Sequence, residues 1–597
     1  MKEILKRSQV REEDTWNMAD IYATDEAWKE DFEKARKEME HASEWKGTLG
    51  TSAAQLKAAL DWNYRVTQRV GKLMVYARQK FDQDTSDSRY QDLSMKAKSL
   101  TVEAKSSLAF VEPEILEIGE EKLRGMLEES EELQFYRRAI EEMLRRNAHT
   151  LSQKEEALLA SAGDIADAPA NAYQMFNNAD IRFQSVRSAE GEELAVTHGT
   201  FVPLQENPDR QVRKAAFESL YGSYGQFKNL LASIFYANIK QDIFYARARK
   251  YSSTRAYHLD GSNIPESVYD NLIDTIHKNI HLMHRYVALR KKMLGVEELH
   301  MYDVYVPLLQ DYTREYSFEE AKAIVKEGLK PLGAEYLSHL QEGFDNRWID
   351  VYENEGKRSG AYSWGCYESH PYVLLNYKGN LDNVFTLAHE MGHALHSYYS
   401  NSTQPYVYSG YRIFVAEVAS TCNEALLIRD MLSKSTDKTE RKALINHFLE
   451  SFKGTVYRQT MFAEFEKICH QKAEQGEVLT AAAINQIYYS LNQFYFGKEM
   501  VSDEAIALEW ARIPHFYTPF YVYQYATGFS AAIALSSKIL EEGEPAVEAY
   551  KSFLKTGGSM DPIDELKIAG VDMTSPEPVQ KALDLFDQLL TEMEELC

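Results

Sequence analysis

Apolar residues recur every three or four positions along much of the chain, which is the spacing of one face of an α-helix. The pattern is clear at Leu56, Leu60 and Tyr64. The same spacing, among many Glu, Lys and Arg, runs through residues 27–48, 113–170, 208–248, 265–296 and 317–343. Prolines number only 15, and because proline breaks helix interiors this scarcity favours long helices. The pattern predicts a mostly α-helical protein.

Two segments depart from the helical spacing. Residues 181–197 alternate around the turn sequence AEGEE, which predicts a small β-hairpin. Residues 361–377 are rich in aromatic and β-branched residues and are split by a polar turn with a proline, which predicts a second hairpin. Residues 555–559 are rich in glycine and predict a tight loop without a phosphate-binding motif.

Composition narrows the class of protein. With 44% hydrophobic and 26% charged residues, the chain is expected to be globular, and its 597 residues suggest about four structural units. The formal net charge of −24 argues against nucleic acid and against an anionic membrane surface as partners.

The chain shows no targeting or membrane signal. It lacks the run of ~18 apolar residues that a membrane helix needs. Its N-terminal segment has charges but no apolar stretch typical of a secretory signal. The 4 cysteines are too few and too scattered for a disulfide framework. We expect a cytoplasmic protein.

The segment His389-Glu390-Met391-Gly392-His393 has the HExxH pattern. On a helix, positions i and i+4 share one face, so both imidazoles can reach a single ion. Glu390 then lies beside the metal, where it can take a proton from a zinc-bound water. The plain alternative is a buried helix whose histidines are simply hydrogen-bonded. The residues favour one Zn²⁺, which manganese or cobalt can replace.

A catalytic zinc needs a third protein ligand. His396 shares the helix face, but one straight helix cannot wrap around an ion, so His396 is expected to pack or to support a ligand. Glu417 lies in an apolar stretch of the next helix, where an unpaired carboxylate is costly, and is the better candidate; the alternative is a surface glutamate. Glu424 could accept a hydrogen bond from a ligating imidazole or serve as a solvated or capping residue.

These residues resemble the M3 family of zinc oligopeptidases, which includes thimet oligopeptidase and neurolysin. The resemblance rests on HEMGH with Glu417 28 residues after His389. Flanking segments are most similar to the bacterial oligoendopeptidase F branch: DTWNMADIY at 14–22, GKRSGAYSWG at 356–365, PYVLLNYKG at 371–379, VFTLAH at 384–389 and GGSMDP at 557–562. The resemblance implies a large helical zincin-type fold that encloses a deep substrate cleft, with small hairpins beside the HExxH helix.

The resemblance also implies an oxyanion-stabilising histidine and tyrosines near the start of a late helix. His515 is followed by Tyr517, Tyr521, Tyr523 and Tyr525, out of register with the family. We place the role on His515 and Tyr525, with Tyr523 and Tyr521 in reserve; the alternative for each tyrosine is an aromatic core position. We expect an N-terminal helical domain over residues 1–200 and a catalytic domain over residues 201–597.

The predicted activity is zinc-dependent cleavage of internal bonds in short oligopeptides. Residues 361–367 are a candidate strand edge for main-chain pairing with the peptide, or else a hairpin that covers the core. Two other functions stay open: an exopeptidase or dipeptidase of a related helical HExxH fold, and a helical peptide-binding scaffold without catalysis.

Overall fold

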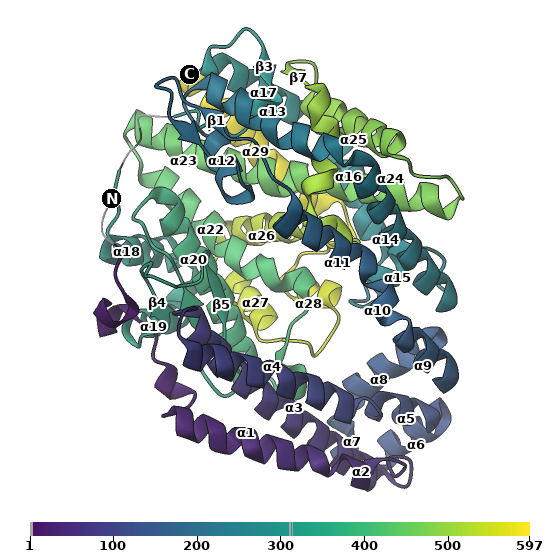
Figure 1. Cartoon of the computed structure of the whole chain (residues 1–597). Coiled ribbons are helices and arrows are strands. Elements are labelled where there is room, and N and C mark those ends of the chain that lie inside the picture. Colours follow the sequence, from purple (N-terminus) through teal and green to yellow (C-terminus); the bar gives the residue numbers. More distant parts are fainter. Residues whose placement is uncertain (1–3, 310–311, 313) are drawn as a thin grey trace. The chain divides into compact units, whose positions relative to one another are not determined.

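The computed structural model describes residues 4–309, 312 and 314–597, and the chain is built mainly of helices (Figure 1). The predicted α class is therefore confirmed. The chain forms two compact units, each assembled from segments that are distant in sequence. The first contains Met1–Thr150, Arg314–Asp430 and Leu535–Val571; the second contains Leu151–Thr313, Met431–Ala534 and Asp572–Cys597. The domain division at residue 200 stays a prediction.

The first unit contains the helices α1 (Asp25–Glu40), α2 (Ala42–Trp45), α3 (Ala53–Asp82), α4 (Ser88–Leu108), α5 (Val111–Glu117), α6 (Glu120–Glu129), α7 (Glu131–Gln134), α8 (Arg137–Arg146), α18 (Phe318–Gly328), α19 (Gly333–Asp345), α20 (Leu381–Thr403), α21 (Tyr406–Ser409), α27 (Glu544–Leu554) and α28 (Pro562–Ile568). Two further helices contribute residues to both units, α22 (Ile413–Lys434) and α26 (Tyr523–Glu542).

Helix α3 shows why the apolar spacing forms a helix. The Ser52 hydroxyl caps its N-terminus by accepting a hydrogen bond from the Gln55 N–H. Leu56 and Leu60 are fully buried and Tyr64 is half-buried, so the predicted stripe is the buried face. Leu56 and Leu60 belong to a core cluster with residues of α5, α6, α7 and α8. Helices α1 and α4 pack against the later part of α3, over residues 62–77.

The second predicted hairpin is confirmed in the first unit. Strand β5 (Tyr362–Trp364) pairs antiparallel with β6 (Tyr372–Leu374). A third strand, β4 (Ile349–Asp350), runs parallel to β6 on its other side, which leaves β5 at a sheet edge. Sequence reasoning missed β4 because two residues carry no periodicity. Helix α20 packs on β5 and β6, so this small sheet adjoins the HExxH helix.

The second unit contains the helices α9 (Gln153–Ser161), α10 (Gly163–Ala166), α11 (Ala168–Met175), α12 (His198–Gln205), α13 (Arg210–Gln226), α14 (Lys228–Ala248), α15 (Thr254–Asp260), α16 (Glu266–Lys278), α17 (Ile280–Leu294), α23 (Lys438–Ser451), α24 (Arg458–Glu474), α25 (Ala481–Phe496) and α29 (Glu577–Leu596). The hairpin predicted over residues 181–197 is confirmed as β1 (Val186–Arg187) and β2 (Glu193–Leu194). Strands β3 (Leu299–His300) and β7 (Met500–Val501) form a parallel pair.

The segment 113–170 differs from its prediction as a long helix, because it is divided among short helices. Gly119 adopts a φ of 86°, a left-handed value that ends one helix and begins the next. Ser130 caps another start by accepting from the Leu133 N–H. Residues 555–559 form turns, as predicted. No helix in the described part of the chain is both long and apolar enough to cross a membrane.

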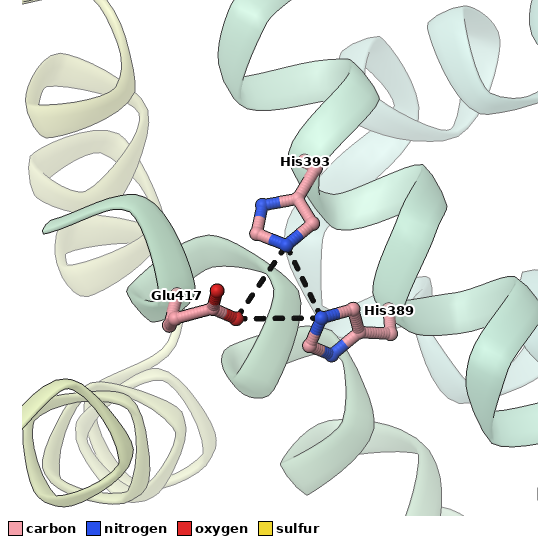
Figure 2. Close-up of side chains that lie close together, drawn as sticks. All are labelled: His389, His393 and Glu417. Atoms are coloured by element: carbon pink, nitrogen blue, oxygen red, sulfur yellow. Dashed lines mark hydrogen bonds and ion pairs between the residues drawn. The ribbon is translucent and has the colours of Figure 1, made fainter. Parts of the chain in front are cut away.

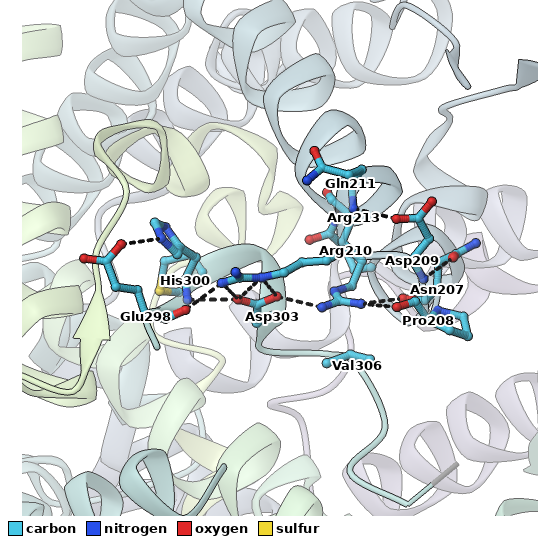
Figure 3. A network of polar contacts seen from close by, with 12 residues as sticks. Asn207, Pro208, Asp209, Arg210, Gln211, Arg213, Glu298, His300, Asp303 and Val306 are labelled. Atoms are coloured by element: carbon cyan, nitrogen blue, oxygen red, sulfur yellow. Dashed lines mark hydrogen bonds and ion pairs between the residues drawn. The ribbon is translucent and has the colours of Figure 1, made fainter. Parts of the chain in front are cut away.

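A buried carboxylate organises part of the second unit (Figure 3). Asp303 is fully buried and accepts hydrogen bonds from Arg210 Nη2 and Arg213 Nη2, each at 2.8 Å. Burial alone would raise the pKa of Asp303, but these arginines and the His300 N–H hold it below its usual value. Since Arg213 is also buried, the carboxylate and guanidinium compensate each other's desolvation.

We expect Asp303→Asn to lower the thermal unfolding midpoint by several degrees. The change keeps the side-chain shape but leaves the Arg213 charge buried without its counter-charge, a loss of about 3–5 kcal/mol. Differential scanning calorimetry measures the shift. Asp92→Asn is the matched control. It breaks the ion pair with Lys96, whose two side chains are 56% and 55% exposed, so its loss should change stability little. Equal midpoints for the two variants would contradict the assignment.

Candidate metal centre

Helix α20 presents the HExxH segment. Its N-terminus is capped by Asn380, whose side chain accepts a hydrogen bond from the Asn383 N–H. Leu387, Met391 and Leu395 recur on one face and are fully buried, so this face fixes the rotation of the helix. The rotation of the helix therefore points both His389 and His393 toward the same side.

Three side chains converge beside this helix (Figure 2). The Nε2 atoms of His389 and His393 lie 3.1 Å apart. Glu417 Oε2, from α22, lies 3.4 Å from His389 Nε2 and 3.5 Å from His393 Nε2. Ligands of a tetrahedral zinc stand about 3.3–3.5 Å from one another, since each bond is ~2.0–2.2 Å. The donor set fits a zinc ion held by two imidazoles and one carboxylate. The two distances to Glu417 lie in this range, and the distance between the imidazole nitrogens is slightly shorter.

Among the residues that the structure describes, this is the only group of three or more His, Cys, Asp or Glu side chains close enough to share a metal ion. His396 is not part of it. Its ring is buried and stacks on the Tyr411 ring at a centroid distance of 3.8 Å. The packing role expected for His396 is therefore confirmed.

Gly392 allows α20 and α22 to approach closely. A Cβ atom at this position would lie 2.5 Å from Ser420 Cα and 2.8 Å from Ala419 O, whereas ordinary contacts begin at 3.4 Å. Only a residue without a side chain permits this approach. Since Glu417 lies one helical turn from Ser420, the same contact sets how far Glu417 reaches toward the histidines. Sequence reasoning missed this role, although Gly392 lies inside the motif.

Glu424 orients one of the imidazoles. Its carboxylate pairs with His389 Nδ1, which leaves Nε2 of that ring facing His393 and Glu417. Glu424 therefore bonds an imidazole and does not act as a solvated or capping residue. Burial opposes protonation of His389, but Glu424 and Glu417 raise its pKa well above the usual value. A bound cation would replace that proton.

The two candidate acidic residues of the centre have opposite environments. Burial would raise the pKa of Glu417, but hydrogen bonds from His389 and His393 lower it, so Glu417 is ionised. Burial raises the pKa of Glu390, which is 7% exposed and whose Oε2 has no hydrogen-bond partner among the described residues. An unsatisfied carboxylate next to a donor cluster is typical of a catalytic base.

The second unit holds the histidine and tyrosines predicted downstream. The rings of Tyr521 and Tyr525 lie 6.2 and 6.1 Å from the exposed ring of His515. Tyr517 instead stacks on Tyr173 at 4.2 Å. Partial desolvation lowers the pKa of His515, which favours its neutral form.

Tyr523 differs from its neighbours in this segment. It is 3% exposed and its ring lies 5.0 Å from Tyr269, so the side chain belongs to the core. Tyr521 and Tyr525 therefore lie beside His515, whereas Tyr517 and Tyr523 pack against other aromatic rings.

Known proteins resemble the chain over nearly its whole length. A model described as Peptidase family M3 matches residues 203–585, and one described as Oligopeptidase F matches residues 114–183. Oligopeptidase PepF of Bacillus subtilis (strain 168) is 52% identical, covering 99% of this chain and 88% of that protein. A putative peptidase from Chlamydophila abortus has a TM-score of 0.93 at 35% identity, covering 100% of both chains. Oligoendopeptidase-F from Enterococcus faecium has a TM-score of 0.76 at 39% identity, covering 96% of this chain and 99% of that one.

We expect Gly392→Ala to weaken metal binding strongly. The added methyl group would push α22 away from α20 and move Glu417 out of reach of the two imidazoles. Competition with a chelator measures the metal affinity. Gly125→Ala is the control, because a Cβ at that helical glycine meets nothing within 4 Å. Unchanged affinity in Gly392→Ala would show that the contact does not set the site.

Proposed function

Because this chain belongs to peptidase family M3, a family of metallopeptidases, we propose that it is a zinc-dependent endopeptidase that cleaves internal bonds of short peptides. The observation that carries the proposal is the convergence of His389, His393 and Glu417 with an unsatisfied Glu390 beside them. The three converging side chains are the proposed zinc ligands, and Glu390 is the proposed base.

Zinc, when bound, supplies a Lewis acid that acidifies water and polarises a carbonyl group. Glu390 accepts a proton from the attacking water as its oxygen bonds to the scissile carbonyl carbon. The carbon–nitrogen bond then breaks, and Glu390 returns the proton to the leaving amine. Burial raises the pKa of Glu390, which makes its carboxylate a stronger base than an exposed one.

His515 and Tyr525 are the proposed donors to the oxyanion of the tetrahedral intermediate. His515 in its neutral form still has one ring N–H to donate. Tyr521 lies 5.5 Å from Tyr525 and is an additional candidate. Tyr523 is the weaker candidate, because its ring is buried against Tyr269.

The substrate class follows from relatives named oligopeptidase and oligoendopeptidase. Strand β5 lies at a sheet edge on α20, where an extended peptide could add as a further strand through main-chain hydrogen bonds. Such pairing accepts many sequences, which suits a peptidase of oligopeptides. We also propose a cytoplasmic location, since Cys366, Cys422, Cys469 and Cys597 are all free thiols.

We expect Glu390→Gln to keep its zinc and to lose turnover by at least about 10²–10⁴-fold, the contribution of a positioned general base. The assay uses a peptide blocked at both ends, which an endopeptidase cleaves and an exopeptidase does not. Metal analysis of the same sample confirms that zinc is retained. Wild-type turnover by a zinc-loaded Glu390→Gln sample would remove the base assignment.

We expect Glu417→Ala to lose more than the roughly 10–100-fold of metal affinity that removal of a supporting residue costs, because a direct ligand is removed. Titration with a zinc indicator measures the change. Glu368→Ala, at a side chain that is 54% exposed, is the matched control. An unchanged zinc affinity would identify a different third ligand.

A further inference from the structure

Phe520 adopts a backbone conformation that aromatic residues rarely take. Its φ is 54°, in the left-handed region. The residue lies in the turn between Pro514–Tyr517, which carries His515, and helix α26, which carries Tyr525. Glycine would take this conformation without strain, so the surroundings must hold Phe520 in place.

A buried glutamate on α24 holds the backbone of this turn. Glu466 Oε1 accepts a hydrogen bond from the Phe520 N–H at 3.0 Å. Glu466 is fully buried, and its Oε2 has no hydrogen-bond partner among the described residues. Burial, together with the nearby Asp242 charge, raises the pKa of Glu466 well above its usual value. The raised pKa favours the neutral acid, and Oε1 is the oxygen that accepts from the turn.

The side chain of Phe520 is held as firmly as its backbone. Its ring lies 4.7 Å from the His470 ring and 5.8 Å from the His258 ring. Asp242 lies between these two histidines, with Oδ2 3.3 Å from His470 Nε2 and Oδ1 3.4 Å from His258 Nε2. Residues of α14, α15 and α24 therefore surround the Phe520 side chain.

The turn sets the position of the aromatic cluster. Tyr521 directly follows Phe520, and its ring stacks with the His515 ring at 6.2 Å. Tyr525 lies in the first turn of α26, 5.5 Å from Tyr521. A change from left-handed to ordinary φ at residue 520 would redirect the chain between His515 and Tyr525, and would separate these rings.

We propose that Glu466 is a positioning residue, which fixes the left-handed turn at Phe520 and thereby places Tyr521 and Tyr525 beside His515. The inference rests on the proposed function, because only there do these side chains stabilise an oxyanion. Glu466 itself contacts no substrate; it acts through the backbone of the turn.

The first test compares Glu466→Leu with Glu466→Gln. Leucine removes the acceptor, so kcat should fall by about 10–100-fold, as expected for misplaced catalytic groups, with KM within about threefold. Glutamine keeps a carbonyl oxygen and should hold kcat within about threefold of wild type. Zinc content, measured on both variants, should be unchanged. Wild-type kcat in Glu466→Leu, or equal losses in both variants, would overturn the inference.

The second test separates positioning from a general loss of stability. In a Tyr521→Phe/Tyr525→Phe background, adding Glu466→Leu should cost almost no further kcat, because the groups that it positions no longer donate. A fully additive loss would indicate a structural role alone and overturn the inference. Wild-type kcat in the double tyrosine variant would overturn it too, since the cluster would then carry no part of the reaction.

If Glu466→Leu does not fold, a pair of variants at Phe520 tests the same inference. Phe520→Gly and Phe520→Ala lose the same ring, but only glycine takes a φ of 54° without strain. We expect kcat of the glycine variant to exceed that of the alanine variant by on the order of tenfold; equal values would overturn the inference. Wild-type protein without chelator-sensitive cleavage of the blocked peptide would instead refute the proposed function.

Discussion

The close approach of α20 and α22 at Gly392 is the contact on which the candidate metal centre depends. It places the backbone of Ser420 where the side chain of any other residue at 392 would lie. One helix supplies two imidazoles in a fixed direction, and the other supplies a carboxylate whose reach is set by the distance between the two axes. A shift of that distance by the size of a methyl group would separate the three donors.

The charges around this contact favour a cation. Glu417 and Glu424 both pair with His389, and Glu390 is buried on the same helix. Three carboxylates in so small a space repel one another, and two imidazoles compensate only part of that repulsion. A divalent cation held by the two histidines and Glu417 would relieve the repulsion and leave Glu390, the proposed base, free to accept a proton.

The second unit follows a similar principle with a neutral group. Burial and the nearby Asp242 charge raise the pKa of Glu466, which favours its neutral form, and Oε1 accepts a hydrogen bond from the Phe520 N–H. The hydrogen bond to Glu466 helps to hold Phe520 in its strained left-handed conformation. Both units therefore use carboxyl groups to fix the direction of nearby side chains. The half-buried Glu424 acts on an imidazole, and the buried Glu466 acts on a turn.

Local pattern was enough to identify some features of this protein. Apolar spacing predicted the helices, and the four-residue separation of His389 and His393 required that they share a helix face. Alternation predicted the hairpin at residues 181–197, and aromatic and β-branched residues around a polar turn predicted the one at 361–377. Other features depend on contacts between residues distant in sequence, which no local pattern encodes. Whether Glu424 bonds an imidazole, which tyrosines lie beside His515, and why residue 392 is glycine were decided by packing between separate elements. The physical reason is that periodicity determines which face of a helix is apolar, whereas the distance between two helices is set only when their side chains meet.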